Sequence, residues 1–384
     1  MPRIELINVS KRWGNFIGVN HLNMVIEDHE FITLLGPSGC GKTTTLRMIA
    51  GLETPTEGKI IIGDKVVFDS DKGINVSPAK RDIGFLFQNY ALWPHMTVYK
   101  NIAFGLENLK WKKPDIEKRV QEVMKMLKIE EFKDRYPAEL SGGQQQRVAI
   151  ARTLAPKPKV LFMDEPLSNL DAKLRGEMRT ELKRLHLDTN STFIYVTHDQ
   201  LEAMTLATRI CLIEKGNLQQ YDPPLVVYNR PNNLFVADFV GNPTMNFVPC
   251  KVGPLDKKTI EVEFYGIKGI FHGDKEFELT SNEAILGIRP EFLPISPNGK
   301  ITGIAYSTLP AGMETTVKIS LNGNILSSVV FGSIDYTIDE EIKFDIISEG
   351  IVLFDPQTKE NIRGKASFFF SLFLNIALLY YPYM

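Results

Sequence analysis

Apolar residues follow different patterns in successive parts of the chain. Up to about residue 240, short and almost wholly apolar runs occur at 31–35, 159–163 and 192–197, and stretches with helical spacing lie between them. Strands that are buried on both faces have this character. The pattern therefore predicts an α/β domain over 1–240, built on a mainly parallel sheet.

The strand signal fades between Gln88 and Pro156. Residues 115–129 instead repeat their apolar positions at intervals of three and four, which is helical spacing. The apolar positions are Ile116, Val120, Val123, Met124 and Leu127. We expect a helical subdomain over about 88–157.

The pattern changes again after residue 240, where apolar and polar residues alternate. Asn322 and Gly323 lie between two such alternating runs, and Asn-Gly in this setting is a strong hairpin signal. Recurrent turns suit a small barrel. We expect a small all-β, OB-like domain over 241–363.

Composition narrows the functional classes. The chain has 384 residues, of which 43% are hydrophobic and 23% charged, with a net charge of −2. This length favours two domains, and the charge balance gives no reason to expect nucleic-acid binding. The three cysteines, Cys40, Cys211 and Cys250, lie far apart, so we expect packing residues in a reducing compartment rather than disulfides.

A glycine-rich loop carries the clearest chemistry. The stretch GPSGCGKTT at 36–44 follows an apolar run, opens a predicted helix and matches the phosphate-binding loop motif. Its backbone N–H groups and the helix N-terminus favour phosphate. We expect Lys42 to reach the β and γ phosphates of ATP, Thr43 to bind Mg²⁺ and Thr44 to contact the α phosphate. The expected nucleotide-binding residues are Gly36, Ser38, Gly39, Cys40, Gly41, Lys42, Thr43 and Thr44.

Two carboxylates end the apolar run at 159–163. Asp164 at the tip of a strand suits a contact with Mg²⁺, directly or through water. Glu165 is then placed to activate the water that attacks the γ phosphate. An Asp-Glu pair alone is weak evidence, but its weight rises beside a phosphate loop.

The stretch LSGGQQQR at 140–147 begins with two adjacent glycines. Ser141 and Gln144 form a capping box, which explains both residues as the start of a helix. Gly142 and Gly143 are costly at a helix start, by up to roughly 1 kcal/mol each relative to Ala. Glycine is reasonable there if something approaches the backbone closely, and an anion at the helix N-terminus is the natural candidate.

In this order, the phosphate loop, LSGGQ and the strand ending in Asp-Glu resemble the ATP-binding cassette (ABC) ATPases. The resemblance covers residues 1 to about 240, and further positions match motifs of the family. It implies roles for Gln88 as the Q-loop residue that senses metal and membrane partner, Asp171 in the D-loop, His198 as the switch histidine at the γ phosphate, and Trp13 as the aromatic that stacks on adenine. The implied metal contacts are Thr43, Gln88 and Asp164, and the implied catalytic residues are Glu165, His198, Lys42 and Gln88.

The same resemblance implies an assembly. LGIRPEF at 286–292 and LFDPQTKENI at 353–362 resemble the C-terminal TOBE domain of sugar-importer ATPases of the maltose type. In that family, ATP held by one subunit is covered by the LSGGQ motif of another. Ser141, Gly143 and Gln144 would therefore act on a partner's nucleotide. The implied partners are a second ATPase subunit, identical or closely related, two membrane permease subunits at the cytoplasmic face of the membrane and, indirectly, an extracellular solute-binding protein.

Other functions remain open at this point. Related cassettes serve importers of polyamines, iron and anions, and the sequence hardly separates these cargoes from sugars. Cassette ATPases of DNA repair carry a long coiled-coil insertion, and ribosomal ones carry two cassettes, neither of which is visible. A protein that only senses nucleotide is disfavoured because every catalytic position is intact.

The C-terminal stretch 364–384 stands apart, since it contains no charged residue from Ala366 to Met384. About 17 apolar residues is the lower limit for a helix that spans a bilayer. A membrane anchor, a segment packed on the β domain and a frameshifted tail are the three interpretations. The rest of the chain is expected to be peripheral to the membrane.

Overall fold

The computed structural model describes residues 3–189, 191–274, 276, 279, 281–362 and 364–369. The chain forms two compact units, Met1–Val227 and Tyr228–Met384. Each unit has a hydrophobic core of its own.

A six-stranded sheet of order β11-β10-β3-β9-β8-β7 is the centre of the first unit. All of its neighbours are parallel except β10 and β11. Every residue of β3, β8 and β9 is buried, which confirms the prediction from their apolar runs. The strands are β3 (Phe31–Leu35), β7 (Ile83–Leu86), β8 (Val160–Asp164), β9 (Thr192–Val196), β10 (Arg209–Glu214) and β11 (Asn217–Asp222).

A second, antiparallel sheet of order β2-β1-β4-β5-β6 belongs to the same unit, and the sequence patterns did not predict it. Its buried side chains share one core with helix α1 (Lys42–Ala50) and residues of the central sheet. The α1 helix is capped by Gly51, whose φ of 81° suits glycine. The strands are β1 (Ile4–Trp13), β2 (Phe16–Ile26), β4 (Glu57–Ile62), β5 (Lys65–Asp69) and β6 (Ile74–Asn75).

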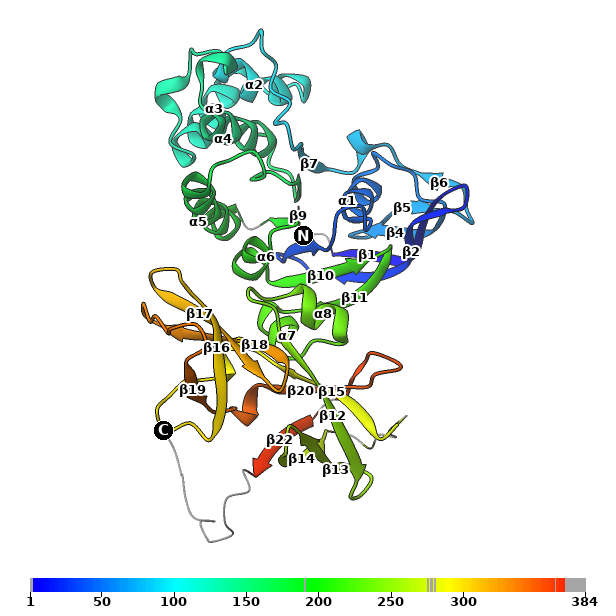
Figure 1. Ribbon diagram of the computed structural model, residues 1–384. Helices are drawn as coiled ribbons and strands as arrows, with labels where there is room; N and C mark the ends of the chain where they lie inside the picture. Colours follow the sequence, from blue (N-terminus) through cyan, green and yellow to red (C-terminus); the bar gives the residue numbers. More distant parts are fainter. Residues whose placement is uncertain are drawn as a thin grey trace, which may run out of the picture. The chain divides into compact units, whose positions relative to one another are not determined.

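The predicted helical subdomain lies between β7 and β8, and Figure 1 shows its helices grouped away from the antiparallel sheet. The helix predicted at 115–129 is α3, which begins two residues earlier and ends at Met126. The helices of this unit are α2 (Val98–Asn108), α3 (Lys113–Met126), α4 (Gly142–Leu154), α5 (Ala172–Thr189) and α6 (Gln200–Leu206), with short 3-10 turns at Pro78–Lys80, Glu130–Phe132 and Pro137–Glu139.

The second unit confirms the predicted all-β domain. A seven-stranded sheet of order β21-β20-β15-β12-β13-β14-β22 and a four-stranded sheet of order β18-β17-β16-β19 enclose one core. Asn322 and Gly323 connect β17 to β18, where Leu321 pairs with Asn324, as the hairpin signal predicted. The short helix α7 (Pro224–Asn229) includes the boundary between the two units, and α8 (Leu234–Phe239) follows it in the second unit. The strands are β12 (Asn246–Pro254), β13 (Thr259–Phe264), β14 (Ile267–Gly273), β15 (Glu283–Ile288), β16 (Ile301–Pro310), β17 (Glu314–Leu321), β18 (Asn324–Phe331), β19 (Glu341–Phe344), β20 (Ile351–Phe354), β21 (Asn361–Ile362) and β22 (Gly364–Phe369), with 3-10 turns at Pro290–Phe292 and Ser348–Gly350.

The apolar C-terminal stretch begins inside this unit. The strand β22 (Gly364–Phe369) pairs antiparallel with β14, so the first residues of the stretch belong to the sheet. Residues 370–384 lie outside the described part of the chain, and with them most of the segment considered as a membrane anchor. Among the described residues, no helix has the length and apolar character needed to span a membrane.

Candidate functional site

The glycine-rich loop joins the end of β3 to the start of α1. Gly41 has a φ of 107°, and a Cβ there would lie 2.3 Å from the carbonyl oxygen of Gly18, so only glycine fits. Lys42 is 5% exposed, and its ammonium donates to the carbonyl oxygens of Gly36 at 2.7 Å and Pro37 at 2.8 Å. The loop therefore holds a positive charge against its own backbone, at the N-terminus of a helix.

Thr43 in the first turn of α1 lies beside Asp164, the last residue of β8. The Thr43 hydroxyl donates to Oδ1 of Asp164 at 2.9 Å. The other oxygen, Oδ2, lies 3.3 Å from Nη2 of Arg47, an interaction that sequence reasoning missed. Hydroxyl and carboxylate oxygens are the ligands that Mg²⁺ prefers. These two side chains therefore fit a magnesium site beside the phosphate loop.

Glu165 contacts two other predicted site residues, Gln88 and His198. Its Oε2 accepts from Nε2 of Gln88 at 3.3 Å and lies 3.5 Å from Nδ1 of His198. The backbone of Glu165 has a φ of 46°, which is uncommon for a residue with a side chain and is often found at functional sites. Ser168, which sequence reasoning missed, donates to the Glu165 carbonyl oxygen at 2.9 Å.

A buried carboxylate lies behind the loop that carries His198, and sequence reasoning did not find it. Glu202 is 3% exposed, and it accepts from the hydroxyls of Tyr195 at 2.7 Å and Thr197 at 2.6 Å. Burial raises the pKa of Glu202, an effect that these two hydroxyl donors oppose. A helix-period pattern alone could not have indicated that this side chain points inward.

The LSGGQ stretch is a capped helix start, as predicted. Ser141 is the N-cap of α4, its backbone N–H donates to Gln144 at 2.8 Å, and the reciprocal bond is 3.4 Å long. A Cβ on Gly143 would lie 2.6 Å from Cδ2 of Leu174, whereas at Gly142 the nearest atom is 3.7 Å away. A side chain of α5 in the same chain therefore already disfavours a Cβ at 143, which is a reason for the glycine that the sequence did not reveal.

The structure does not bring every predicted site residue into one cluster. Among the described residues, no hydrogen bond or ion pair joins Ser141, Gly143 or Gln144 to the phosphate loop, and Figure 1 shows α4 with α2 and α3 rather than with α1. Asp171 accepts from the backbone N–H of Leu174 at 3.0 Å, at the start of α5.

Trp13 lies at the end of β1 with 45% of its surface exposed. Its ring stacks on Phe16 with 6.1 Å between the centroids, and the Lys11 ammonium lies 5.2 Å from the ring. An exposed, supported indole is a suitable platform for a flat base. Trp13 is therefore available for stacking.

The cysteines have the packing role that was expected. All three are buried and free. Burial raises the pKa of the Cys40 thiol within the phosphate loop and that of Cys250 to about 12. These thiols are therefore protonated at physiological pH.

Comparison with known proteins identifies the family. The sequence model of the ABC transporter family matches residues 19–168. The trehalose/maltose import ATP-binding protein MalK of Thermococcus litoralis is 51% identical over 296 residues, covering 76% of this chain and 79% of that protein. The sn-glycerol-3-phosphate import ATP-binding protein UgpC of Ruegeria sp. is 42% identical over 94% of this chain and 99% of its own length.

A solved structure agrees with these relatives. The dimeric, post-hydrolysis structure of the ATP-binding cassette MJ0796 with ADP and Pi superposes with a TM-score of 0.50 and 34% identity, covering 58% of this chain and 98% of that one. The matched share corresponds in size to the α/β unit that carries the phosphate loop. The chain therefore belongs to the ABC transporter family and is an ATP-binding, ATP-hydrolysing subunit of such a transporter.

Proposed function

We propose that this chain energises the import of a sugar by a membrane permease. The observation that carries the proposal is the 51% identity to a trehalose/maltose import protein, together with the β-rich second unit that bears LGIRPEF at 286–292. The 42% identity to a glycerol-3-phosphate import protein keeps an anionic cargo as the second candidate, and polyamine and iron cargoes remain further alternatives.

Each part of the cluster has a proposed role toward ATP. Lys42 and the backbone N–H groups of 36–44 bind the β and γ phosphates, and Trp13 stacks on adenine. Thr43 and Asp164, with the amide oxygen of Gln88, would hold Mg²⁺, which supplies positive charge against the phosphate oxygens when bound. The 2.9 Å contact between the Thr43 hydroxyl and Asp164 supports this assignment, since both oxygens already face one place.

Glu165 is the proposed general base. Glu165 takes a proton from the attacking water, and His198 contacts the γ phosphate. Gln88 senses the bound metal and the membrane partner. Support comes from the shared oxygen Oε2 of Glu165, which lies within 3.5 Å of both partner side chains. A base whose carboxylate is already oriented by two neighbours needs little reorganisation when water arrives.

The catalytic unit is proposed to be a dimer in which each ATP is covered by the Ser141 and Gly143 backbone of the other subunit. The N-terminus of the 13-residue helix α4 carries a positive dipole, which favours an anion. The dimeric state of the cassette structure with ADP and Pi agrees with this arrangement. ATP would then join the subunits, and hydrolysis would weaken the contact.

Coupling to the permease is assigned to the segment that follows Gln88. Arg152 donates to the carbonyl oxygens of Tyr90 and Ala91 at 2.7 and 2.6 Å, and its guanidinium lies 4.7 Å from the ring of Trp93. These contacts fix the segment to α4, the helix that begins with LSGGQ. A displacement of the segment by the permease would therefore move α4, and a displacement of α4 would move the segment. Docking would place the chain at the cytoplasmic face of the membrane as a peripheral subunit.

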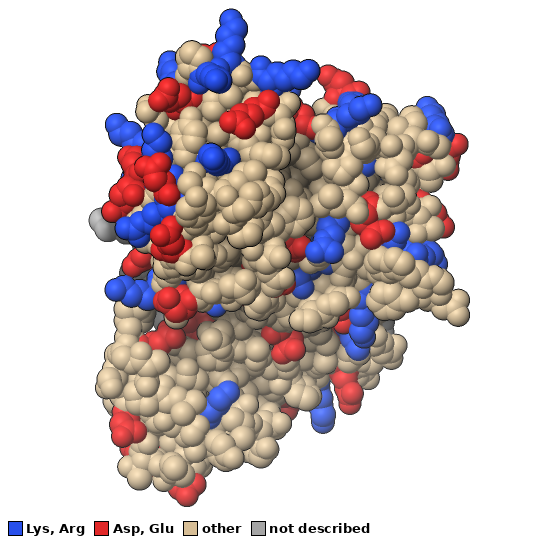
Figure 2. Space-filling view, turned by 90° about the horizontal axis from the view of Figure 1, so that it is seen from above, with Lys and Arg blue, Asp and Glu red and all other residues tan. Residues whose placement is uncertain are grey.

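The distribution of surface charge gives no support to nucleic acid as a partner. On the face seen in Figure 2, the described basic and acidic side chains are interspersed rather than gathered by sign. The phosphate backbone of a nucleic acid binds to a continuous basic surface. The described residues of this face do not form one.

The test of the catalytic assignment is Glu165→Gln in the purified chain. We expect the variant to bind ATP as the wild type does and to lose at least about 100-fold in hydrolysis, since a positioned general base contributes 10²–10⁴-fold. Hydrolysis that survives this change would show that Glu165 is not the base.

A second experiment identifies the cargo. Candidate sugars, glycerol phosphate and polyamines are added to membranes that contain the full transporter, and the compound that stimulates ATP hydrolysis is the cargo.

A further inference from the structure

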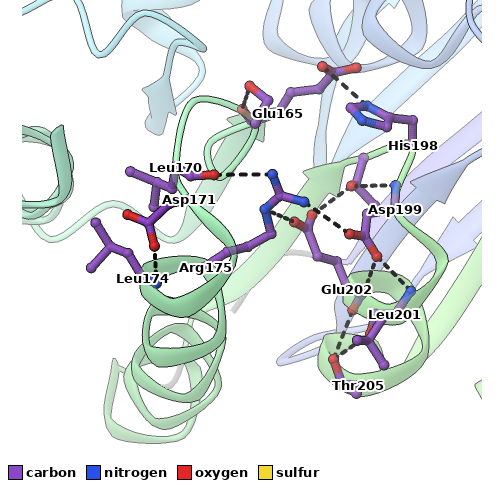
Figure 3. A network of polar contacts seen from close by, with 12 residues as sticks. Glu165, Leu170, Asp171, Leu174, Arg175, His198, Asp199, Leu201, Glu202 and Thr205 are labelled. Carbon is purple, nitrogen blue, oxygen red and sulfur yellow. Dashed lines mark hydrogen bonds and ion pairs between the residues drawn. The ribbon is translucent and has the colours of Figure 1, made fainter. Parts of the chain in front are cut away.

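Arg175 lies in the first turns of α5 and contacts two loops of the site at once. Its Nη2 donates to the carbonyl oxygen of Leu170 at 3.2 Å, within the stretch 168–175 that contains Asp171. Its Nη1 lies 3.5 Å from Oδ2 of Asp199, and its Nε lies 4.0 Å from Oε1 of Glu202. Figure 3 shows the guanidinium between these three groups. Arg175 therefore joins the segment before α5 to the segment before α6.

The two carboxylates that Arg175 contacts hold the residues on both sides of His198. Asp199 is the N-cap of α6, and its Oδ1 accepts from the backbone N–H groups of Leu201 and Glu202 at 2.8 and 3.1 Å. Glu202 accepts from the Thr197 hydroxyl at 2.6 Å, and that hydroxyl in turn accepts from the Asp199 N–H at 3.0 Å. The backbone position of His198 thus depends on a closed set of bonds around these carboxylates.

The charges in this set need a cation. Burial raises the pKa of Glu202, and the nearby Asp199 raises it further. Arg175 is the described cation that contacts both. Its planar guanidinium donates to Leu170 and Asp199, and its Nε lies at ion-pair distance from Glu202 without a hydrogen bond to it.

We propose that Arg175 is a positioning residue for ATP hydrolysis, which sets the loop of His198 relative to the segment 168–171 by joining Leu170 to Asp199 and Glu202. The proposal rests on the roles proposed above for His198 and Glu165. His198 lies 3.5 Å from the carboxylate of Glu165, so a shift of its loop moves a side chain that contacts the proposed base. Since Asp171 lies in the same segment as Leu170, the link also passes through the part of the chain expected to face the second subunit.

A purely structural role predicts a different outcome. If Arg175 only stabilised the fold, its removal would lower the melting temperature and reduce ATP binding and turnover together. If Arg175 positions His198, turnover falls while ATP affinity is kept, because Lys42, Thr43 and Trp13 are untouched. The ratio of the effect on kcat to the effect on KM therefore separates the two roles.

The experiment compares Arg175→Gln, Arg175→Lys and the control Arg184→Gln in the full chain. Arg184 lies on the same helix, its side chain is 84% exposed, and its described ion pair is with Asp188 on that helix. We expect R175Q to lower kcat by roughly 10- to 100-fold, since a displacement of about 1 Å can cost 10²-fold. The KM for ATP should stay within about twofold of the wild type. R175K should recover part of the loss, and R184Q should behave as the wild type.

Asp199→Asn provides a second route that does not depend on how well R175Q folds. Asn caps a helix about as well as Asp, so α6 keeps its start while the charge partner of Arg175 is lost. We expect D199N to lower kcat with KM unchanged, and the double variant D199N/R175Q to lose less than the product of the single effects.

The proposal is overturned if R175Q and D199N both keep kcat within about twofold of R184Q, if KM rises by the same factor as kcat falls, or if their effects multiply. If R175Q does not fold, D199N alone decides by the same criteria.

Failure of the proposed catalytic site gives a different result. If Glu165 is not the base, Glu165→Gln leaves hydrolysis intact. If E165Q loses activity while R175Q keeps full activity, only the role of Arg175 is refuted.

Discussion

Two separate reasons favour glycine at position 143: the close packing of Leu174 and the proposed approach of a partner's ATP. Gly143→Ala adds one methyl group that affects both. A Cβ at this site would lie 2.6 Å from Cδ2 and 3.1 Å from Cδ1 of Leu174, well inside van der Waals contact. Leu174 is partly buried and packs against the core beneath the helical subdomain. Gly143→Ala therefore forces the Leu174 side chain to move, and it also adds a Cβ at the helix end where a partner's ATP is proposed to bind.

The expected change in stability is a balance of two terms. Overpacking of this kind costs about 1–3 kcal/mol, and the atoms that must move are the end of one side chain, which favours the lower part of that range. Replacing Gly by Ala in a helix gains up to about 1 kcal/mol, and less in the first turn. The net destabilisation is about 1 kcal/mol, which corresponds to a fall in melting temperature of about 2–4 °C for a unit of this size.

Calorimetry of the wild type, G143A, L174A and the double variant tests the two terms. In the L174A background the clash is absent, so G143A should become neutral or slightly stabilising. If G143A costs the same free energy in both backgrounds, the Leu174 contact is not the reason for the glycine. ATPase assays of the same four proteins address the second demand. The double variant should have lower ATPase activity than L174A although G143A no longer lowers its stability, because the added methyl still faces the proposed nucleotide.

Two further changes test other parts of the account. Trp13→Ala should weaken ATP binding by roughly 10-fold with kcat unchanged, since base–aromatic stacking is worth about 1–3 kcal/mol, and titration with a fluorescent ATP analogue measures it. A W13A variant with wild-type affinity would remove Trp13 from the site. Burial lowers the pKa of His186 from its ordinary value of 6.5, so the folded state binds fewer protons than the unfolded state, and stability should fall as pH drops below 6.5. Denaturant unfolding at pH 7.5 and 5.5 should show a smaller loss in His186→Gln than in the wild type, and equal losses would contradict this assignment.

The sequence predicted those features whose cause is local. The apolar runs at 31–35 and 192–197 became β3 and β9, and the capping box of Ser141 and Gln144 formed as expected, because burial on both faces and helix capping leave direct signatures in short stretches. The antiparallel sheet β2-β1-β4-β5-β6 left no such signature, since long-range pairing places Ile4 opposite both Ile26 and Ile62.

The site likewise contains residues that local motifs indicate and residues that only the tertiary fold reveals. Motifs indicated Lys42, Asp164 and Glu165 because phosphate and metal chemistry restricts which residues occur at fixed spacings. Arg175 and Glu202 have no motif of their own in that reasoning. Their importance comes from the tertiary fold, which brings the starts of α5 and α6 together, and from the burial of a carboxylate that a charged helix pattern suggests to be exposed.

The central claim is that each ATP is held by one subunit and covered by another, and a cis–trans test of two substitutions addresses it directly. Lys42→Ala disables the phosphate loop, and Ser141→Arg blocks the start of α4. Two differently tagged chains are expressed together and the mixed pairs are isolated by two affinity steps. One pair carries K42A in one chain and S141R in the other, and the second pair carries both changes in one chain and none in its partner.

If sites form between subunits, the first pair keeps one intact site and hydrolyses ATP, whereas the second pair has none and is inactive. If each chain completes its own site, the order reverses, because the unchanged chain of the second pair remains whole. We predict activity in the first pair and its loss in the second. Activity only in the second pair would contradict the account.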